Sequence, residues 1–212
     1  MKILLVDDHT VLRQGLKQIL ADSLVRAQFG EAGNCGEALE QLSKKPWDVL
    51  VLDINLPGRS GLEILREVRD YYPRLPVLVL SSAPEEQLAT RVLKSGASGY
   101  LNKQTAPEEL VQAVRKIYSG GRYVSARLAE KLAADLASSE KEPHEQLSNR
   151  EFQVMQLLAA GGSLKDIADQ LSLSAKTIST FRGRILKKLR IENNVELAHY
   201  AREKGLLEIH RA

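Results

Sequence analysis

This sequence has almost no cysteine and no apolar run of the length that a membrane helix requires. Its single cysteine, Cys35, excludes an internal disulfide framework and suits a reducing compartment. A transmembrane helix needs roughly 20 consecutive apolar residues, and no stretch approaches that length. The N-terminus does not resemble a signal peptide, because the short apolar run Ile3–Val6 ends at once in Asp7 and Asp8. We therefore expect a soluble, cytoplasmic protein.

The net charge is also small, at +3, but it is unevenly distributed along the chain. Residues 1–120 carry 15 basic and 15 acidic side chains, and residues 121–146 carry 4 and 5. Residues 147–212 carry 11 basic side chains against 7 acidic ones. The C-terminal part is therefore the one that we expect to contact a polyanion.

The first 118 residues alternate between strand-like and helix-like segments. The strand-like segments are short and rich in Val, Leu and Ile: Lys2–Val6, Arg26–Glu31, Val49–Leu52, Val77–Leu80 and Gly99–Leu101. Such continuous apolar runs are typical of strands that are buried on both faces, as in a parallel sheet. Together with the helical spacing between them, they predict an α/β domain over residues 1–118 with a five-stranded, parallel, doubly wound sheet.

The remainder of the chain divides into a linker and a helical domain. Residues 119–146 begin with Gly120-Gly121 and end in a polar stretch, so they are predicted to be a linker with one short helix over Ser125–Leu136. From residue 147 to 212 the pattern is helical throughout. A capping box at Ser148 and Glu151, a break at Gly161-Gly162 and a further helix over Ala175–Leu189 predict an all-α helix-turn-helix domain.

Charged and hydroxyl side chains follow the predicted strands at their carboxyl ends, where parallel sheets bind ligands. Asp7 and Asp8 follow the first strand and Asp53 follows the third. Three converging carboxylates repel one another unless a cation such as Mg²⁺ lies among them. Ser81 and Lys103 follow the fourth and fifth strands. A carboxylate nucleophile, a metal, a hydroxyl and an ammonium group are what phosphoryl transfer to an aspartate would use.

Three stretches carry a specific family resemblance: Ile3-Leu4-Leu5-Val6-Asp7-Asp8-His9, Asp53-Ile54-Asn55-Leu56-Pro57-Gly58 and Gly96-Ala97-Ser98-Gly99-Tyr100-Leu101-Asn102-Lys103. They resemble the receiver domains of two-component response regulators. The resemblance implies that Asp53 is the phosphoacceptor. It also implies a Mg²⁺ site formed by Asp8, by Asp53, by Asp7 mostly through water, and by the main-chain carbonyl of Asn55.

The same resemblance implies that Ser81 and Lys103 hold the phosphoryl oxygens and that Tyr100 is an aromatic switch residue. Many relatives have a proline in a cis peptide after the lysine, whereas Gln104 follows Lys103 here. A cis bond before a residue other than proline costs several kcal/mol more, so that geometry is not carried over.

The segment from Ser174 to Arg190 contains six basic residues and no acidic one. The helical spacing of Ile178, Phe181, Ile185 and Leu189 predicts a buried stripe. Arginines and hydroxyls can reach base edges in a major groove, while lysines neutralise phosphates. The predicted DNA-binding residues are Lys176, Thr177, Ser179, Thr180, Arg182, Gly183, Arg184 and Lys187. The alternative is a solvated amphipathic helix with an incidental excess of positive charge.

The surrounding motifs favour the DNA-binding interpretation. Leu147–Glu151, Ala160–Ala168 and Leu173–Ile178 resemble the LuxR-type helix-turn-helix domain of NarL/FixJ-class response regulators. Ser179–Arg182 and the segment from Val195 to Leu206 resemble most its BvgA/EvgA/GacA-like members. The two resemblances together cover nearly the whole chain except the linker.

We therefore expect a response regulator that a sensor histidine kinase phosphorylates on Asp53 and that regulates transcription by binding double-stranded DNA. The resemblance implies a homodimer on phosphorylation and makes RNA polymerase a further candidate partner. We expect no enzyme, although a metal-dependent phosphatase or hydrolase using Asp7, Asp8 and Asp53 is an alternative. A second alternative is a receiver protein that acts through protein partners only.

Overall fold

The computed structural model describes residues 1–56, 61–83, 85–126, 128–130, 132 and 142–207. The chain forms two compact units, Met1–Leu132 and Ala133–Ala212. Half of the helix that we predicted over Ser125–Leu136 lies outside the described residues. None of the helices in the described part of the chain is long and apolar enough to cross a membrane.

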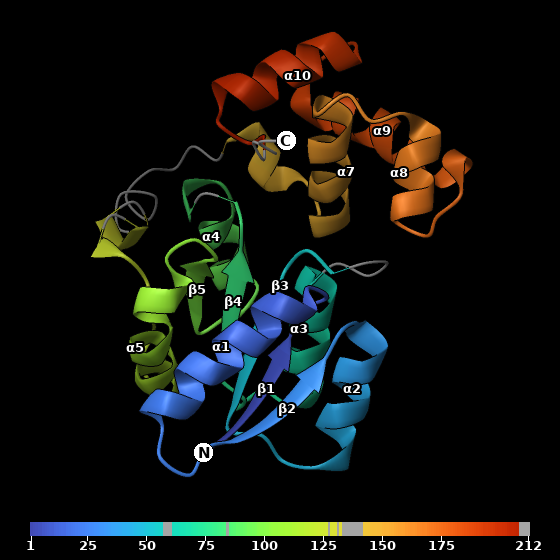
Figure 1. Cartoon of the computed structure of the whole chain (residues 1–212). Coiled ribbons are helices and arrows are strands. Elements are labelled where there is room, and N and C mark those ends of the chain that lie inside the picture. The colour runs from blue at the N-terminus through green and yellow to red at the C-terminus, as the bar shows by residue number, and fades with distance from the viewer. Residues whose placement is uncertain (57–60, 84, 127, 131, 133–141, 208–212) are drawn as a thin grey trace. The chain divides into compact units, whose positions relative to one another are not determined.

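The first unit contains a parallel sheet with the strand order β2-β1-β3-β4-β5. Its elements alternate along the chain (Figure 1) as β1 (Lys2–Val6), α1 (Thr10–Ser23), β2 (Gln28–Ala32), α2 (Cys35–Lys44), β3 (Val49–Asp53), α3 (Gly61–Tyr71), β4 (Val77–Ser81), α4 (Glu85–Lys94), β5 (Gly99–Asn102) and α5 (Ala106–Tyr118). The predicted five-stranded, doubly wound, parallel α/β fold is confirmed.

Some predicted strand boundaries were wrong: β2, β3, β4 and β5 each end one residue later than predicted, and the start of β2 was predicted two residues too early. We expected the second strand to begin at Arg26, but β2 begins at Gln28. Arg26 has a φ of 60°, in the left-handed region, and the amide of Ala27 donates to the carbonyl of Leu24. These residues therefore form a turn after α1, because the left-handed conformation is incompatible with an extended strand.

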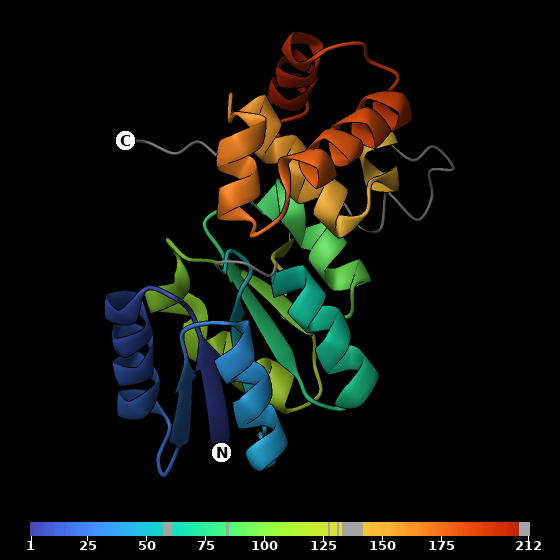
Figure 2. The same cartoon turned by 90° about the vertical axis from the view of Figure 1, so that its right-hand side faces the viewer.

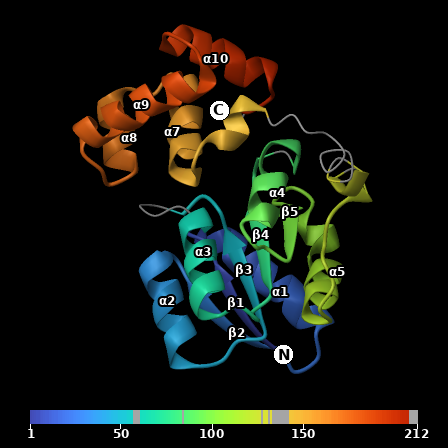
Figure 3. The same ribbon diagram turned by 180° about the vertical axis from the view of Figure 1, so that it is seen from behind.

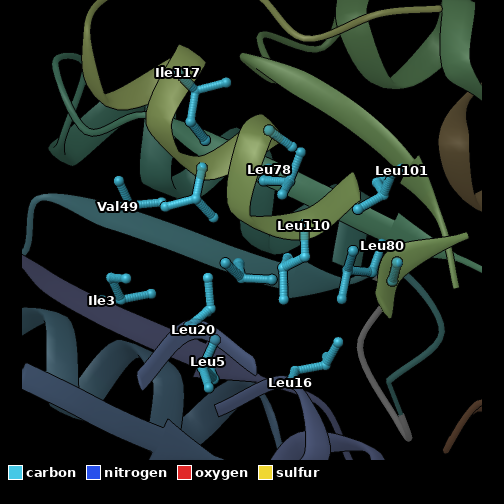
Figure 4. Packing of buried hydrophobic residues seen from close by; sticks show 14 of the residues in the cluster. Ile3, Leu5, Leu16, Leu20, Val49, Leu78, Leu80, Leu101, Leu110 and Ile117 are labelled. Atoms are coloured by element: carbon cyan, nitrogen blue, oxygen red, sulfur yellow. The ribbon is translucent and has the colours of Figure 1, made fainter. Parts of the chain in front are cut away.

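Both faces of the sheet are covered by helices, which explains the continuous apolar runs. Figure 2 shows α1 on one side of the sheet and α2 and α3 on the other, and Figure 3 shows α2 and α3 from behind. The core between the sheet, α1 and α5 consists of alternate strand residues and of one face of each helix (Figure 4); it includes Ile3, Leu5, Leu16, Leu20, Val49, Leu78, Leu80, Leu101, Leu110 and Ile117. Every second side chain of a strand thus points to one face of the sheet, and the side chains between them point to the other face.

The second unit is helical in all its described elements, as the sequence predicted. It contains η1 (Pro143–Gln146), α7 (Asn149–Ala159), α8 (Leu164–Gln170), α9 (Ala175–Leu189) and α10 (Asn194–Glu203). The predicted capping box is present at the start of α7. Ser163 caps α8 and Ser174 caps α9 in the same way, by accepting a hydrogen bond from a backbone amide two or three residues into the helix.

Glu151 joins α7 to α9 through an ion pair in which the carboxylate is buried and Lys188 is exposed. Its Oε2 lies 2.6 Å from Nζ of Lys188 and also accepts the amide of Ser148 at 2.7 Å. Burial raises the pKa of the Glu151 carboxyl, but the donors from Lys188 and Ser148 outweigh it, so that the pKa is below its ordinary value of 4.5. The carboxylate is therefore charged at neutral pH.

Gly61 allows α3 to start directly against the end of β3. The Gly61 amide donates to the carbonyl of Ile54 at 2.9 Å. A Cβ at position 61 would lie 2.6 Å from the Asp53 carbonyl oxygen and 2.6 Å from the Ile54 Cα. Both atoms belong to the backbone, so the clash cannot be relieved by turning a side chain.

We predict that Gly61→Ala lowers the free energy of unfolding by about 1–3 kcal/mol, the usual range for overpacking a core. The control is Gly15→Ala, because Gly15 lies within α1 and a Cβ there meets nothing within 4 Å. It should raise stability by about 0.5–1 kcal/mol through helix propensity. Urea unfolding followed by the fluorescence of the single tryptophan, Trp47, measures both. Equal effects of the two substitutions would contradict the close packing at Gly61.

We predict that Glu151→Gln lowers the free energy of unfolding by about 1–3 kcal/mol at neutral pH, because Lys188 loses its charged partner. Since the folded-state pKa of Glu151 is lowered, its contribution is complete above its ordinary value of 4.5 and is lost as the pH falls through the lowered pKa. The difference in melting temperature between wild type and variant should therefore shrink on acidification. Glu192→Gln, at an exposed site, is the control. A difference that is constant with pH would refute this account.

Candidate functional site

The carboxyl edge of the sheet gathers polar side chains that are almost completely buried. Asp7 directly follows β1, Asp53 ends β3 and Ser81 ends β4, and their exposed fractions are 2%, 0% and 0%. Asp8 is more exposed, with 32% of its side chain accessible. These residues come together because the carboxyl ends of parallel strands meet at one edge of the sheet.

Lys103, just after β5, bridges the two buried carboxylates. Its Nζ lies 2.7 Å from Oδ2 of Asp53 and 2.8 Å from Oδ2 of Asp7. The other oxygen of Asp53 accepts the amide of Asn55 at 3.0 Å. The buried Oδ2 of Asp7 has no donor that is aligned well enough for a hydrogen bond, although the ammonium group is close. This oxygen retains the capacity to bind a cation.

Opposing effects determine the protonation of the buried pair. Burial raises the pKa of the Asp53 carboxyl, and the Lys103 ammonium and the Asn55 amide offset this only in part. Burial acts to lower the pKa of Lys103, but the carboxylates of Asp53 and Asp7 outweigh it, so that the pKa is raised. Lys103 thus stays positively charged, and a second positive charge near the carboxylates would favour the ionised form of Asp53.

The ligand atoms in this pocket suit a hard divalent cation. One atom from each of Asp7, Asp8, His9 and Asp53 can be chosen so that all four lie within 4.8 Å of one another. Carboxylate oxygens are the ligands that Mg²⁺ prefers, and the Oδ2 atom of Asp7 is available to it. His9 was in the sequence motif but had no predicted role; its Nδ1 lies 2.9 Å from Oδ1 of Asp8.

A hydrogen-bond cluster surrounds the main-chain carbonyl of Ala83, beyond β4. The Tyr100 hydroxyl donates to it at 2.6 Å and the Asn102 amide group at 3.1 Å, while Ser81 Oγ accepts the Ala83 amide at 3.0 Å. Tyr100 is buried.

No cis peptide bond occurs among the described residues, so the Lys103–Gln104 bond is trans. Pro57 and Gly58, which belong to the Asp53 motif, lie outside the described residues.

Helix α9 buries one stripe and exposes the opposite, basic face. Ile178, Ile185 and Leu189 are buried, as predicted, whereas Phe181 is half-buried and Leu186 takes a place in the stripe that the sequence did not predict. Among the predicted DNA-binding residues, the exposed ones are Lys176, Ser179, Thr180, Gly183, Arg184 and Lys187.

The other two predicted DNA-binding residues, Thr177 and Arg182, are half-buried and engaged within the unit. The Thr177 hydroxyl lies 2.8 Å from that of the helix cap Ser174. The Arg182 Nε donates to Oδ1 of Asn194, the first residue of α10, at 2.7 Å. The outer basic face of α9 is therefore narrower than the sequence suggested. Lys188 is also turned away from it, toward Glu151.

Each of the two units matches the model of a known protein family. Residues 3–115 match the family model described as the response regulator receiver domain. Residues 145–201 match the model described as bacterial regulatory proteins, luxR family. The first match covers more than half of the chain.

Similar proteins extend over almost the whole chain. The response regulator UvrY of Escherichia coli (strain K12) is 38% identical, over 96% of this chain and 94% of its own. The response regulator GacA of Pseudomonas aeruginosa is 37% identical over 98% of both. A solved structure of the RcsB response regulator of Salmonella typhimurium has a TM-score of 0.74 at 27% identity, covering 96% of this chain and 98% of that one. RcsB from Salmonella enterica serovar Typhimurium, bound to promoter rprA in the presence of phosphomimetic BeF3-, has a TM-score of 0.68 at 27% identity, covering 94% and 98%.

The family resemblance predicted from the sequence motifs is thereby confirmed. A parallel α/β receiver domain comes first, and a helical luxR-family domain follows it. The chain belongs to the response regulators of two-component systems, in the NarL/FixJ class.

Proposed function

We propose that a sensor histidine kinase phosphorylates this response regulator on Asp53, and that phosphorylation controls binding of α9 to double-stranded DNA and thereby transcription. The observation that carries the proposal is the buried Asp53 carboxylate held by Lys103 beside Asp7, in a chain that also exposes the basic face of α9. The proposal divides the chain into a receiver over residues 1–118, a linker over 119–146 and a DNA-binding domain over 147–212. Such a protein would act in the cytoplasm.

In the proposed reaction, an Asp53 carboxylate oxygen attacks the phosphorus atom of the donor, and the bond from phosphorus to the leaving group breaks. Lys103, which neutralises Asp53 before the reaction, would then pair with a phosphoryl oxygen. The Ser81 hydroxyl, whose oxygen accepts the Ala83 amide, keeps its own proton to donate. Asp7, Asp8, Asp53 and the Asn55 carbonyl would hold Mg²⁺, which supplies positive charge against the phosphoryl oxygens.

Phosphorylation of Asp53 would change the rest of the receiver through the main-chain carbonyl of Ala83. A hydrogen bond from Ser81 to the new phosphoryl group would move the segment after β4, to which Tyr100 and Asn102 are bonded. Tyr100 would thus act as the switch residue. A local change of charge acting on an element with two states is a known regulatory device.

On DNA, the exposed face of α9 would enter the major groove, with Lys176, Arg184 and Lys187 close to phosphates or bases. Thr177 and Arg182 would support that face from within the domain. A homodimer formed on phosphorylation would place two such helices on half-sites about one helical turn apart. RNA polymerase is a further candidate partner. The family consists of transcription regulators and is not a known class of enzymes.

The first test selects bound fragments from a random DNA library in the presence of Mg²⁺, with and without a small phosphodonor. We predict that the wild-type chain enriches an inverted repeat only with the phosphodonor and that Asp53→Ala does not. Asp70→Ala is the control, because Asp70 is an exposed carboxylate of α3. Equal enrichment without phosphodonor would remove Asp53 as the switch. No enrichment in any condition would favour the alternative of a receiver that acts through protein partners only.

A second test separates two neighbouring lysines of α9. Lys187 is exposed on the outer face, whereas Lys188 is bound to Glu151. We predict that Lys187→Gln weakens binding to the selected DNA and reduces the slope of log affinity against log salt concentration by roughly one. Lys188→Gln should lower the melting temperature and leave that slope unchanged. A changed slope for Lys188→Gln together with an unchanged slope for Lys187→Gln would contradict the proposed orientation of α9 on DNA.

A further inference from the structure

A set of contacts outside the acidic pocket connects α1 and β2 to the backbone of the pocket itself. Arg13, in α1, directs its Nη1 to the main-chain carbonyl of Asp7. Its Nε donates to Oε2 of Glu31, in β2, at 3.1 Å. Only 14% of the Arg13 side chain and 25% of the Glu31 side chain are exposed. The arginine is thus held at both ends of its guanidinium group.

The carbonyl that Arg13 binds belongs to the peptide unit between Asp7 and Asp8. On the other side of Asp7, its amide donates to the carbonyl of Ala32, at the end of β2, at 3.1 Å. The backbone of Asp7 is therefore fixed on both sides. Because the peptide unit is planar, fixing its carbonyl also fixes the direction in which the chain enters Asp8. The relative placement of the two carboxylates depends on this peptide.

Glu31 keeps Arg13 in the required orientation. A long arginine side chain loses conformational entropy when it is held in one geometry. Its planar guanidinium group fixes the directions of two hydrogen bonds, whereas the three rotatable donors of a lysine do not. Glu31 is itself held: Lys17 Nζ lies 2.7 Å from its Oε1, and Gln14 Nε2 donates to its Oε2 at 2.8 Å. The hydrogen bond from Lys17 lowers the pKa of Glu31, burial opposes it and Arg13 adds to it, so the net direction is downward. The partner of Arg13 is therefore an anion at neutral pH.

We infer that Arg13, oriented by Glu31, is a positioning residue that sets the geometry of Asp7 and Asp8 for binding a divalent cation and so for phosphorylation of Asp53. The inference rests on the proposed function. The Arg13 guanidinium group donates to Glu31 and to the main-chain carbonyl of Asp7, and this carbonyl is its link to the carboxylate groups of the pocket. The role requires the shape of the guanidinium group and not merely its positive charge.

The test measures the affinity of the full chain for Mg²⁺ by calorimetry, with the melting temperature of each variant recorded alongside. Arg13→Lys keeps the charge but cannot bind Glu31 and the Asp7 carbonyl through one rigid fork. It should weaken Mg²⁺ binding on the order of tenfold, the lower end of the range for residues that orient metal ligands. Glu31→Gln should act in the same direction. The double variant should bind Mg²⁺ no more weakly than Arg13→Lys alone, because the two residues act through one contact.

The matched control is Arg115→Lys, because Arg115, in α5, also donates to a main-chain carbonyl, but to that of Ser23 at the C-terminal end of α1, at 2.9 Å. Its Mg²⁺ affinity should stay within about twofold of wild type. Arg13→Lys and Glu31→Gln variants that lose melting temperature but keep wild-type Mg²⁺ affinity would show a purely structural role and overturn the inference. Weak Mg²⁺ binding by Arg13→Gln but not by Arg13→Lys would overturn it too, in favour of a charge effect.

The proposed function and this inference can fail separately. The stoichiometry of phosphoryl transfer to wild-type Asp53 from a small phosphodonor is measured in the same samples. Normal Mg²⁺ binding without phosphorylation would overturn the proposed function, while the variants would still decide the role of Arg13. Absence of Mg²⁺ binding by the wild-type chain would overturn the inference together with the metal site.

Discussion

The arrangement of the receiver depends on the burial of three charged groups at one edge of the sheet. Asp53 and Asp7 are withdrawn from water almost completely, and Lys103 is the cation that both of them share. A buried charge is tolerated only when it is paired and hydrogen-bonded. This requirement ties the ends of β1 and β3 to the segment after β5, so three strand ends are held in register by one ammonium group. Gly61 contributes to the same arrangement, because α3 can approach the end of β3 only if position 61 carries no side chain.

The two flanks of this charged centre differ in the kind of bonds that hold them. On the side of β1 and β2, Arg13 and Glu31 form a charge-assisted pair, and removing one member of such a pair exposes the other to a large desolvation cost. On the side of β4 and β5, Tyr100 and Asn102 donate to the single carbonyl of Ala83, and these bonds are between neutral groups. Neutral hydrogen bonds have a net value of only about 1 kcal/mol each. Rearrangement is therefore easier on the second flank, where the segment after β4 lies.

Much of this organisation could be predicted from the sequence because it follows from local pattern. Continuous apolar runs of five residues predict parallel strands, and the residues that end those runs predict the contents of the pocket. The turn at Arg26 could not be predicted, since a left-handed arginine has no signature in composition. The Arg13–Glu31 contact could not be predicted either, because it joins residues 18 positions apart through the pairing of β1 with β2. The pocket residues were thus found from their positions at strand ends, whereas their supports were visible only in three dimensions.

For helix α9, too, part of the arrangement could not be predicted from the sequence. Net charge counts every cation of α9 equally, but in the structure two of them make contacts within the unit: the exposed Lys188 pairs with Glu151, and the half-buried Arg182 binds the start of α10. Hydrophobic spacing predicts which face is buried, yet lysine and arginine are long enough to reach inward from the margin of that face. Such margin positions cannot be assigned without knowing what faces them. The surface charge available to a polyanion on α9 is consequently concentrated in fewer residues, Lys176, Arg184 and Lys187 among them, than the excess of basic residues in the sequence implies.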